Sequence, residues 1–350
     1  MNILPHNLYG LLALSLMLCI SCSQQNSNES NKKMNTSEPR YTGSVEVMDD
    51  ALSEIIDTNA KPEIIGEGFE WSEGPVWVEN EQFLLFSDIP VNIIFKWKEG
   101  EGISQYLNPS GYTGEDDYNG EPGSNGLIID HDNTLVLAQH GDRRIARMQS
   151  ALTNPQPDFE TIAGSYDGKK LNSPNDVVQH SNGSFYFTDP PYGLKGGVDG
   201  PGKELDFHGV YKVDKDGNVA VLTDKLSRPN GIAFSPDEQT LYVANSDPEH
   251  AVWMAYDVKS DGTIENGRIF YDVTANAAEE KGLPDGLKVD KDGHLFATGP
   301  GGVWIFAEDG QPLGRIKTGQ ATANCAIGDQ GDMLYLTADM YLMRFPLKNN

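Results

Sequence analysis

The sequence has few basic residues, few cysteines and no apolar run long enough to cross a membrane. Its 350 residues carry 26 lysines and arginines against 52 aspartates and glutamates, which gives a formal net charge of −26. A chain this acidic repels phosphate backbones, so nucleic acid is excluded as a partner. There are only 3 cysteines, and no second pair or nearby histidine completes a zinc site with Cys19 and Cys22.

The N-terminus has the pattern of an export signal. Residues 8–20 form an apolar run of 13, too short to span a bilayer but right for the core of a signal peptide. The run ends in Cys19-Ile20-Ser21-Cys22, which is similar to a bacterial lipoprotein signal with Cys22 as the acylated residue. We therefore predict a lipoprotein signal peptide over residues 1–21 and a periplasm-facing lipoprotein of the cell envelope. The alternative is an ordinary secretory signal and release into the periplasm.

Residues 22–43 contain too few apolar side chains to bury a core. They predict a disordered tether, so that the chain would contact a membrane only through its N-terminal lipid anchor.

A short phrase recurs six times beyond residue 60. Each copy starts with a side chain that carries an oxygen, most often followed by glycine, and the copies lie 52, 50, 55, 55 and 39 residues apart. Their first residues are Glu73, Asn125, Asn175, Asn230, Asp285 and Asn324. A fixed period of this length is typical of repeat architectures.

Each phrase opens a pattern of short strands. An apolar strand such as residues 126–130 is followed by a polar turn, a second strand and, in most copies, two further strands. Four strands repeated six times predict an all-β fold, a six-bladed β-propeller of four-stranded blades over residues 44–350. Two stacked β-sandwiches are the alternative, but they do not explain why one polar phrase recurs at matching positions.

The last copy ends one strand short, after residues 341–347. The spare strand, residues 62–66, lies just before the first phrase, where every other copy has its fourth strand. We therefore predict that this N-terminal strand closes the ring as the outer strand of the last blade. Residues 46–56 have apolar residues at helical spacing and predict a short helix outside the ring.

The six phrases predict one site. The first strand of each propeller blade lines the central channel, so their first residues converge on one end of the axis. Two carboxylates and four amides gathered there need a cation or a dense hydrogen-bond network. Oxygen donors without cysteine or histidine clusters favour one divalent cation, calcium first, with magnesium, manganese or zinc as alternatives.

Longer motifs occur in order along the chain, including FEWSEGPVW, EPGSNGL, LNSPNDVV, FTDPPYG, SRPNGIAFSPD and LPDGLKVD. Over residues 60–345 they resemble the gluconolactonase / regucalcin (senescence-marker protein) / luciferin-regenerating-enzyme family, and within it the bacterial gluconolactonase-like branch. The resemblance implies a six-bladed propeller with a catalytic divalent cation on its axis. The ligands that it implies are Glu73, Asn175, Asn230 and Asp285.

The resemblance also implies a reaction. The cation would polarise a lactone carbonyl, and a carboxylate beside it would assist the attack of water. By resemblance that carboxylate is Asp285. Asp189 and His140 end the second strands of two blades beside the site and are the alternatives as catalytic residues.

Two long loops lie on the same face as the phrases, at residues 108–124 and 190–209, and predict a lid over the substrate. The candidate substrate-binding residues at this end are Asn125, His140, Arg143, Tyr192 and Asn324.

Three functions follow as hypotheses. The first is a metal-dependent lactonase that hydrolyses a small sugar lactone to the aldonic acid. The second is an organophosphate or other ester hydrolase that uses the same metal site. The third is a propeller that binds a ligand without catalysis.

Overall fold

The computed structural model describes residues 38–197 and 200–348. The predicted signal peptide, Cys22 and residues 22–37 of the predicted tether lie outside the described residues. Within those residues no helix is both long enough and apolar enough to cross a membrane.

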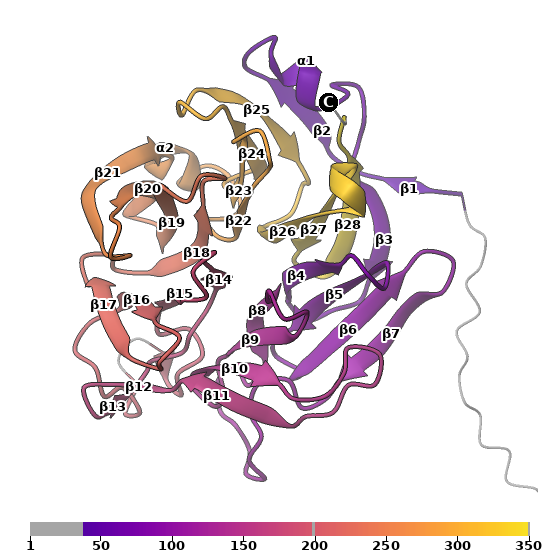
Figure 1. Ribbon diagram of the computed structural model, residues 1–350. Coiled ribbons are helices and arrows are strands. Elements are labelled where there is room, and N and C mark those ends of the chain that lie inside the picture. Colours follow the sequence, from indigo (N-terminus) through magenta and orange to yellow (C-terminus); the bar gives the residue numbers. More distant parts are fainter. Residues whose placement is uncertain (1–37, 198–199, 349–350) are drawn as a thin grey trace, which may run out of the picture. The chain divides into compact units, whose positions relative to one another are not determined.

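Six antiparallel sheets surround a central axis (Figure 1), as predicted for a six-bladed propeller. In the first three blades the strands follow one another along the chain, from the axis outward. The first blade has β4 (Ser72–Val78), β5 (Phe83–Asp88), β6 (Ile93–Lys98) and β7 (Gly102–Leu107). The second has β8 (Ser124–Ile129), β9 (Leu135–Gln139), β10 (Arg144–Met148) and β11 (Phe159–Ala163). The third has β14 (Val177–Gln179), β15 (Phe185–Asp189), β16 (Gly209–Val213) and β17 (Val219–Thr223).

The last three blades repeat the same order. The fourth has β18 (Pro229–Phe234), β19 (Thr240–Asp247), β20 (His250–Val258) and β21 (Ile264–Asp272). The fifth has β22 (Leu287–Val289), β23 (Leu295–Gly299), β24 (Gly302–Phe306) and β25 (Pro312–Lys317). The sixth has β26 (Thr322–Gly328), β27 (Met333–Ala338) and β28 (Tyr341–Pro346). The elements outside the six blades are a two-stranded ribbon, β12 (Ser165–Tyr166) and β13 (Lys169–Lys170), the short helices α1 (Leu52–Ile55) and α2 (Thr274–Ala277), and a 3₁₀ turn, η2 (Asp329–Gly331).

The N-terminal part of the chain completes the sixth blade. Strand β3 (Glu63–Glu67) pairs antiparallel with β28, so the predicted closure of the ring is confirmed. Strand β1 (Arg40–Tyr41) adds a fifth strand outside β3. The predicted tether therefore extends too far, because residues 40 and 41 belong to the sixth sheet.

The helix predicted over residues 46–56 is only partly present. Its first part is strand β2 (Ser44–Val47), which pairs with β25 as a fifth strand of the fifth blade. Only α1 is helical, and Leu52 and Ile55 bury their side chains between the fifth and sixth blades. The strand forms because the outer edge of β25 offers unpaired backbone groups, a tertiary effect that local spacing does not report.

The hydrophobic core is divided among the blade interfaces. Six clusters of buried apolar side chains lie between neighbouring blades, and each draws residues from two blades. Both faces of a blade are thus covered, which explains why its inner strands are apolar on both sides. The polar phrases lie at the axis, where five of their six first residues are also buried.

Candidate functional site

The six phrases meet at one end of the axis, as the repeat predicts. Each lies at the start of an innermost strand or within two residues of it. The backbones approach so closely that the second position needs glycine in most copies. A Cβ on Gly74 would lie 1.9 Å from the carbonyl oxygen of Asn125, and a Cβ on Gly231 would lie 2.2 Å from the carbonyl oxygen of Asp285.

A cavity of about 480 Å³ opens at this end. The four predicted cation ligands, Glu73, Asn175, Asn230 and Asp285, all line it, and so do the predicted substrate-binding residues Asn125 and Tyr192. The structure thus brings together one residue from each of five blades and one from the long loop before β16. Glu121, Ser246 and Glu280 are further polar wall residues.

Several oxygens of this wall have no hydrogen-bond partner although they are shielded from solvent. They are Asn125 Oδ1, Tyr192 Oη, Asn230 Oδ1 and Asp285 Oδ1. A buried acceptor without a donor is unfavourable, and a bound cation or the hydroxyl groups of a ligand would satisfy it. The donor set therefore fits a hard divalent cation.

The amide of Asn230 is held in one orientation. Its Nδ2 donates to Ser246 Oγ at 3.0 Å, and Ser246 Oγ in turn donates to the carbonyl of Pro284. Because the amide nitrogen is engaged on the Ser246 side, Oδ1 is the atom left for a ligand. Glu73 is fixed in a similar way, since its Oε2 accepts the N–H of Gly74 at 2.7 Å and Asn324 Nδ2 at 3.3 Å.

The electrostatics of the site also favour a cation. Burial raises the pKa of the Asp285 carboxyl well above its usual range, and the negative charges of Glu73 and Asp176 raise it further. Burial raises the pKa of Glu73 as well, against the hydrogen bond from Gly74, and the charge of Asp176 adds to the effect. If Glu73, Asp176 and Asp285 were all ionised they would repel one another, and a divalent cation would remove most of that repulsion.

Asp176 was not among the predicted site residues. It is buried beneath the cavity, where its Oδ1 accepts the N–H of Val177 at 2.9 Å and its Oδ2 that of Ile232 at 3.3 Å. The sequence does contain a signal for it, because four of the six phrases have glycine at this position and the third has aspartate.

Four of the predicted catalytic and substrate-binding residues do not line the cavity. Asp189 Oδ2 accepts the backbone N–H of Asn172 at 2.8 Å, and Asp88 and Asn245 hold the matching loops of their own blades in the same way. Asp189 thus helps to hold its loop, while its Oδ1 is buried without a hydrogen-bond partner and burial raises its pKa to about 7.

The other three residues do not line the cavity but contact residues around it. His140 is fully buried, and its Nδ1 lies 3.1 Å from Oε2 of Glu121, the residue that does line the cavity. Arg143 donates from Nε to the carbonyls of Leu171 and Asn172 and does not line the cavity. Asn324 contacts Glu73 rather than the cavity, as described above.

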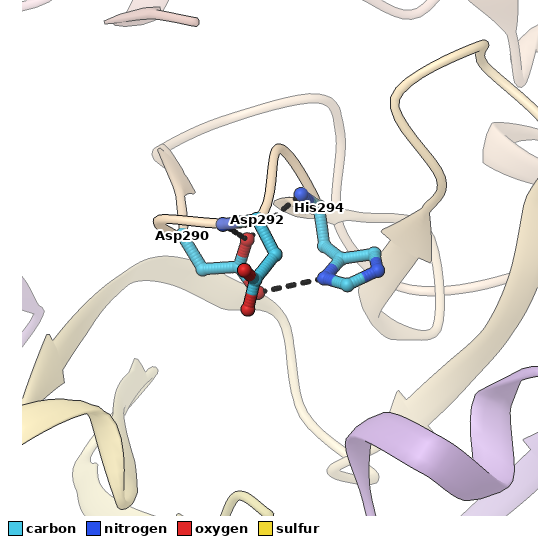
Figure 2. A group of neighbouring side chains, drawn as sticks. All are labelled: Asp290, Asp292 and His294. Atoms are coloured by element: carbon cyan, nitrogen blue, oxygen red, sulfur yellow. Dashed lines mark hydrogen bonds and ion pairs between the residues drawn. The ribbon is translucent and has the colours of Figure 1, made fainter. Parts of the chain in front are cut away.

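A second group, two aspartates and a histidine (Figure 2), lies on the turn between β22 and β23, at the opposite end of the fifth blade. Asp290, Asp292 and His294 offer ligand atoms within 4.8 Å of one another. Their contacts are those of a hairpin turn, because Asp290 Oδ1 accepts the N–H groups of Asp292 and His294 at 2.9 and 2.8 Å. Asp130 and Asp214 make the same two bonds in the second and third blades, so the group repeats with the fold and needs no ion.

These features define a six-bladed propeller with one acidic, oxygen-lined cavity at an end of its axis. Residues 71–339 match the family described as the SMP-30/gluconolactonase/LRE-like region, and the chain belongs to this family. The family resemblance predicted from the motifs is confirmed.

Individual relatives agree with this assignment. A gluconolactonase from Zymomonas mobilis is 40% identical over 304 residues, which cover 85% of this chain and 84% of the relative. A pentonolactonase from Haloferax volcanii is 26% identical over 76% of this chain and 80% of its own. Among solved structures, a gluconolactonase from Xanthomonas campestris superposes with a TM-score of 0.76 at 31% identity, covering 89% of this chain and 98% of that one.

Proposed function

We propose that this protein is a metal-dependent lactonase that hydrolyses a sugar lactone, such as D-glucono-1,5-lactone, to its aldonic acid. The 40% identity to a gluconolactonase over most of both chains supports a lactone-hydrolysing hydrolase. The observation that carries the finer proposal is the set of partnerless oxygens of Asn230 and Asp285 in an acidic cavity. The volume of about 480 Å³ lies in the range of small-molecule sites.

Glu73, Asn175, Asn230 and Asp285 would hold one divalent cation, with calcium as the first choice for carboxylate and amide oxygens. When bound, the cation supplies Lewis-acid polarisation of the carbonyl and stabilises the negative charge that develops on its oxygen. Ser246 and Asn324 orient two of these side chains, as their hydrogen bonds to Asn230 and Glu73 require.

Asp285 is the group best placed to move a proton. Its Oδ1 has no partner and its residue lines the cavity, whereas neither of the alternatives, Asp189 and His140, lines it. In the proposed reaction Asp285 Oδ1 takes a proton from the attacking water, whose oxygen bonds to the carbonyl carbon. The ring carbon–oxygen bond then breaks, and the proton passes to the leaving ring oxygen.

The test uses purified protein with and without a chelator, on D-glucono-1,5-lactone and on a phosphotriester. Chelator-sensitive hydrolysis of the lactone, restored by added calcium, would support the proposal. Preference for the phosphotriester would favour an organophosphate hydrolase instead. Absence of both activities, with retained binding of a sugar lactone, would leave a ligand-binding propeller.

We also propose that the protein is a lipoprotein anchored through Cys22 and facing the periplasm. The apolar run of residues 8–20 followed by Ser21-Cys22 supports this. Cys22→Ala should release the protein from the membrane fraction, as measured by fractionation and immunoblotting. A wild-type protein already found in the soluble periplasmic fraction would favour the ordinary secretory signal.

A further inference from the structure

An ion cluster lies behind one wall of the cavity, in the fifth blade. At its centre is Arg315 of β25, which is only 5% exposed. Its Nε donates to Glu46 at 3.0 Å, and its Nη1 donates to Glu280 and to the carbonyl of Pro300. The guanidinium lies over Trp304, 4.6 Å from the ring centroid. The carboxylates of Glu46 and Glu280 thus both bind the buried guanidinium of Arg315.

Lys317 balances the charge of this cluster. Its Nζ lies 3.1 Å from Glu280 Oε1 and 3.5 Å from Glu46 Oε2, so two carboxylates meet two cations. Partial burial of Glu280 opposes ionisation, but hydrogen bonds from Arg315 and Lys317 prevail and lower its pKa. Glu280 is therefore an ionised carboxylate held in one place.

The residue that carries this carboxylate also lies in the wall of the substrate cavity. Glu280 lines it, five residues before Asp285 on the loop that follows α2. The loop is fixed to the β23–β24 turn, because the N–H of Gly301 donates to the carbonyl of Lys281 at 2.8 Å. Among the described residues, no lysine, arginine or histidine lines the cavity, so Glu280 can use its remaining lone pairs toward a ligand.

We propose that Glu280 determines specificity by accepting hydrogen bonds from substrate hydroxyl groups, and that Arg315 and Glu46 are its positioning residues. The inference rests on the proposed function, since it concerns how the same cavity distinguishes one lactone from another. Glu46 belongs to β2, outside the family match at residues 71–339. An N-terminal strand beyond the family region thus contributes to recognition of the substrate.

We expect variants of this cluster to bind hydroxylated lactones less well, without losing activity on every lactone. A hydrogen bond from a hydroxyl group to a carboxylate is stronger than one between neutral groups. A lactone that lacks hydroxyl groups makes no such bond, so its kinetic constants should not change when Glu280 is replaced. The pair of substrates is D-glucono-1,5-lactone and δ-valerolactone, which share the six-membered ring but differ in hydroxylation.

The chain offers a matched control in the sixth blade. Arg344 donates to Glu63 at 2.7 Å and to Glu99, and it lies 5.6 Å from the ring centroid of Trp97. This cluster also joins an N-terminal strand to a blade through an arginine and a tryptophan. It does not contribute to the substrate cavity. Arg344→Met therefore measures the structural cost of losing such a cluster.

The experiment compares kcat and KM of the full-length wild type, Glu280→Ala, Arg315→Met, Arg315→Lys, Glu46→Gln and Arg344→Met on both lactones. Where δ-valerolactone turns over too slowly, its inhibition constant replaces KM. For gluconolactone, Glu280→Ala and Arg315→Met should raise KM about 10-fold or more, with kcat little changed. For δ-valerolactone the change should stay below about 2-fold. Arg315→Lys should recover part of the loss, and Glu46→Gln should shift KM in the same direction by a smaller factor.

Several results would overturn the proposal. Equal losses on both lactones, or an equal rise of KM in Arg344→Met, would make the cluster merely structural. If Arg315→Met does not fold, Glu280→Ala and Arg315→Lys give the same comparison. A wild-type protein that hydrolyses neither lactone would instead overturn the proposed function itself, so the two failures are distinguishable.

Discussion

The two ends of the propeller both gather acidic side chains, but they use them differently. At the turn end, Asp130, Asp214 and Asp290 each accept two backbone N–H groups of their own hairpin. At the site end, Asn230 and Asp285 keep oxygens that no donor reaches. Acidic side chains lie close together at both ends. The end that we expect to bind a cation differs in having side-chain oxygens without hydrogen-bond partners.

The strongest test of this contrast is Asp285→Asn at the site end. The change preserves volume but removes a negative charge and the proposed proton acceptor. We expect kcat on gluconolactone to fall about 10²- to 10⁴-fold, while calcium still raises the melting temperature because three ligands remain. Steady-state kinetics and thermal unfolding with and without calcium measure the two effects. Retention of near-normal kcat would remove Asp285 from the reaction.

A second test removes a neutral ligand. Asn230→Ala removes one proposed oxygen ligand of the cation without changing the charge of the site. The affinity for calcium should therefore fall, and excess calcium should partly restore activity. Isothermal titration calorimetry measures the affinity, with one binding site per chain expected in the wild type. Unchanged calcium affinity in this variant would place the cation elsewhere.

A smaller effect is expected from the residue that orients this ligand. Ser246→Ala removes the partner of Asn230 Nδ2 and leaves all four proposed ligands in place. Loss of such an orienting group typically costs about 10- to 100-fold in metal affinity or activity. Because the cation should still bind, saturating calcium should restore most of the activity of Ser246→Ala. Failure of calcium to do so would show that Ser246 contacts the substrate directly.

The smallest functional effect should come from the turn end. Asp290→Ala together with His294→Ala removes the group of Figure 2. Activity and the number of calcium ions bound should not change. Stability should fall by about 1–3 kcal/mol, because two backbone N–H groups and a side-chain contact lose their acceptor. A loss of one bound calcium ion would show that the turn end is a metal site after all.

Much of the fold could be predicted from the sequence because the repeat supplies its own register. Six copies of one phrase fix the starts of the inner strands, and the missing strand after β28 identifies residues 62–66 as its replacement. Strand β2 was mistaken for the start of a helix because its four residues gain their conformation from the edge of β25. No pattern within these four residues indicates that they will pair with the edge of β25.

The sequence predicted which residues converge on the cavity where those residues repeat, and it missed the cavity residues that do not repeat. The four residues that we propose as cation ligands occupy equivalent positions in their blades, so their convergence follows from symmetry. Asp189 and His140 also end equivalent strands, but neither lines the cavity, and Asp189 accepts the N–H of Asn172 instead. Glu121 and Glu280 belong to loops that differ between blades, and only the folded chain shows that they reach the cavity.

The closure of the sixth blade also constrains how the chain can be made. Strand β3 pairs with β28, and Glu63 lies opposite Arg344 near the other end of the sequence. Strand β3 therefore has no pairing partner until nearly the whole chain is available for folding. Pairing at such long range is slow, and an incomplete product has an open ring with unpaired strand edges. Full-length synthesis is thus a condition of folding, and prematurely terminated chains should be substrates for cellular proteases.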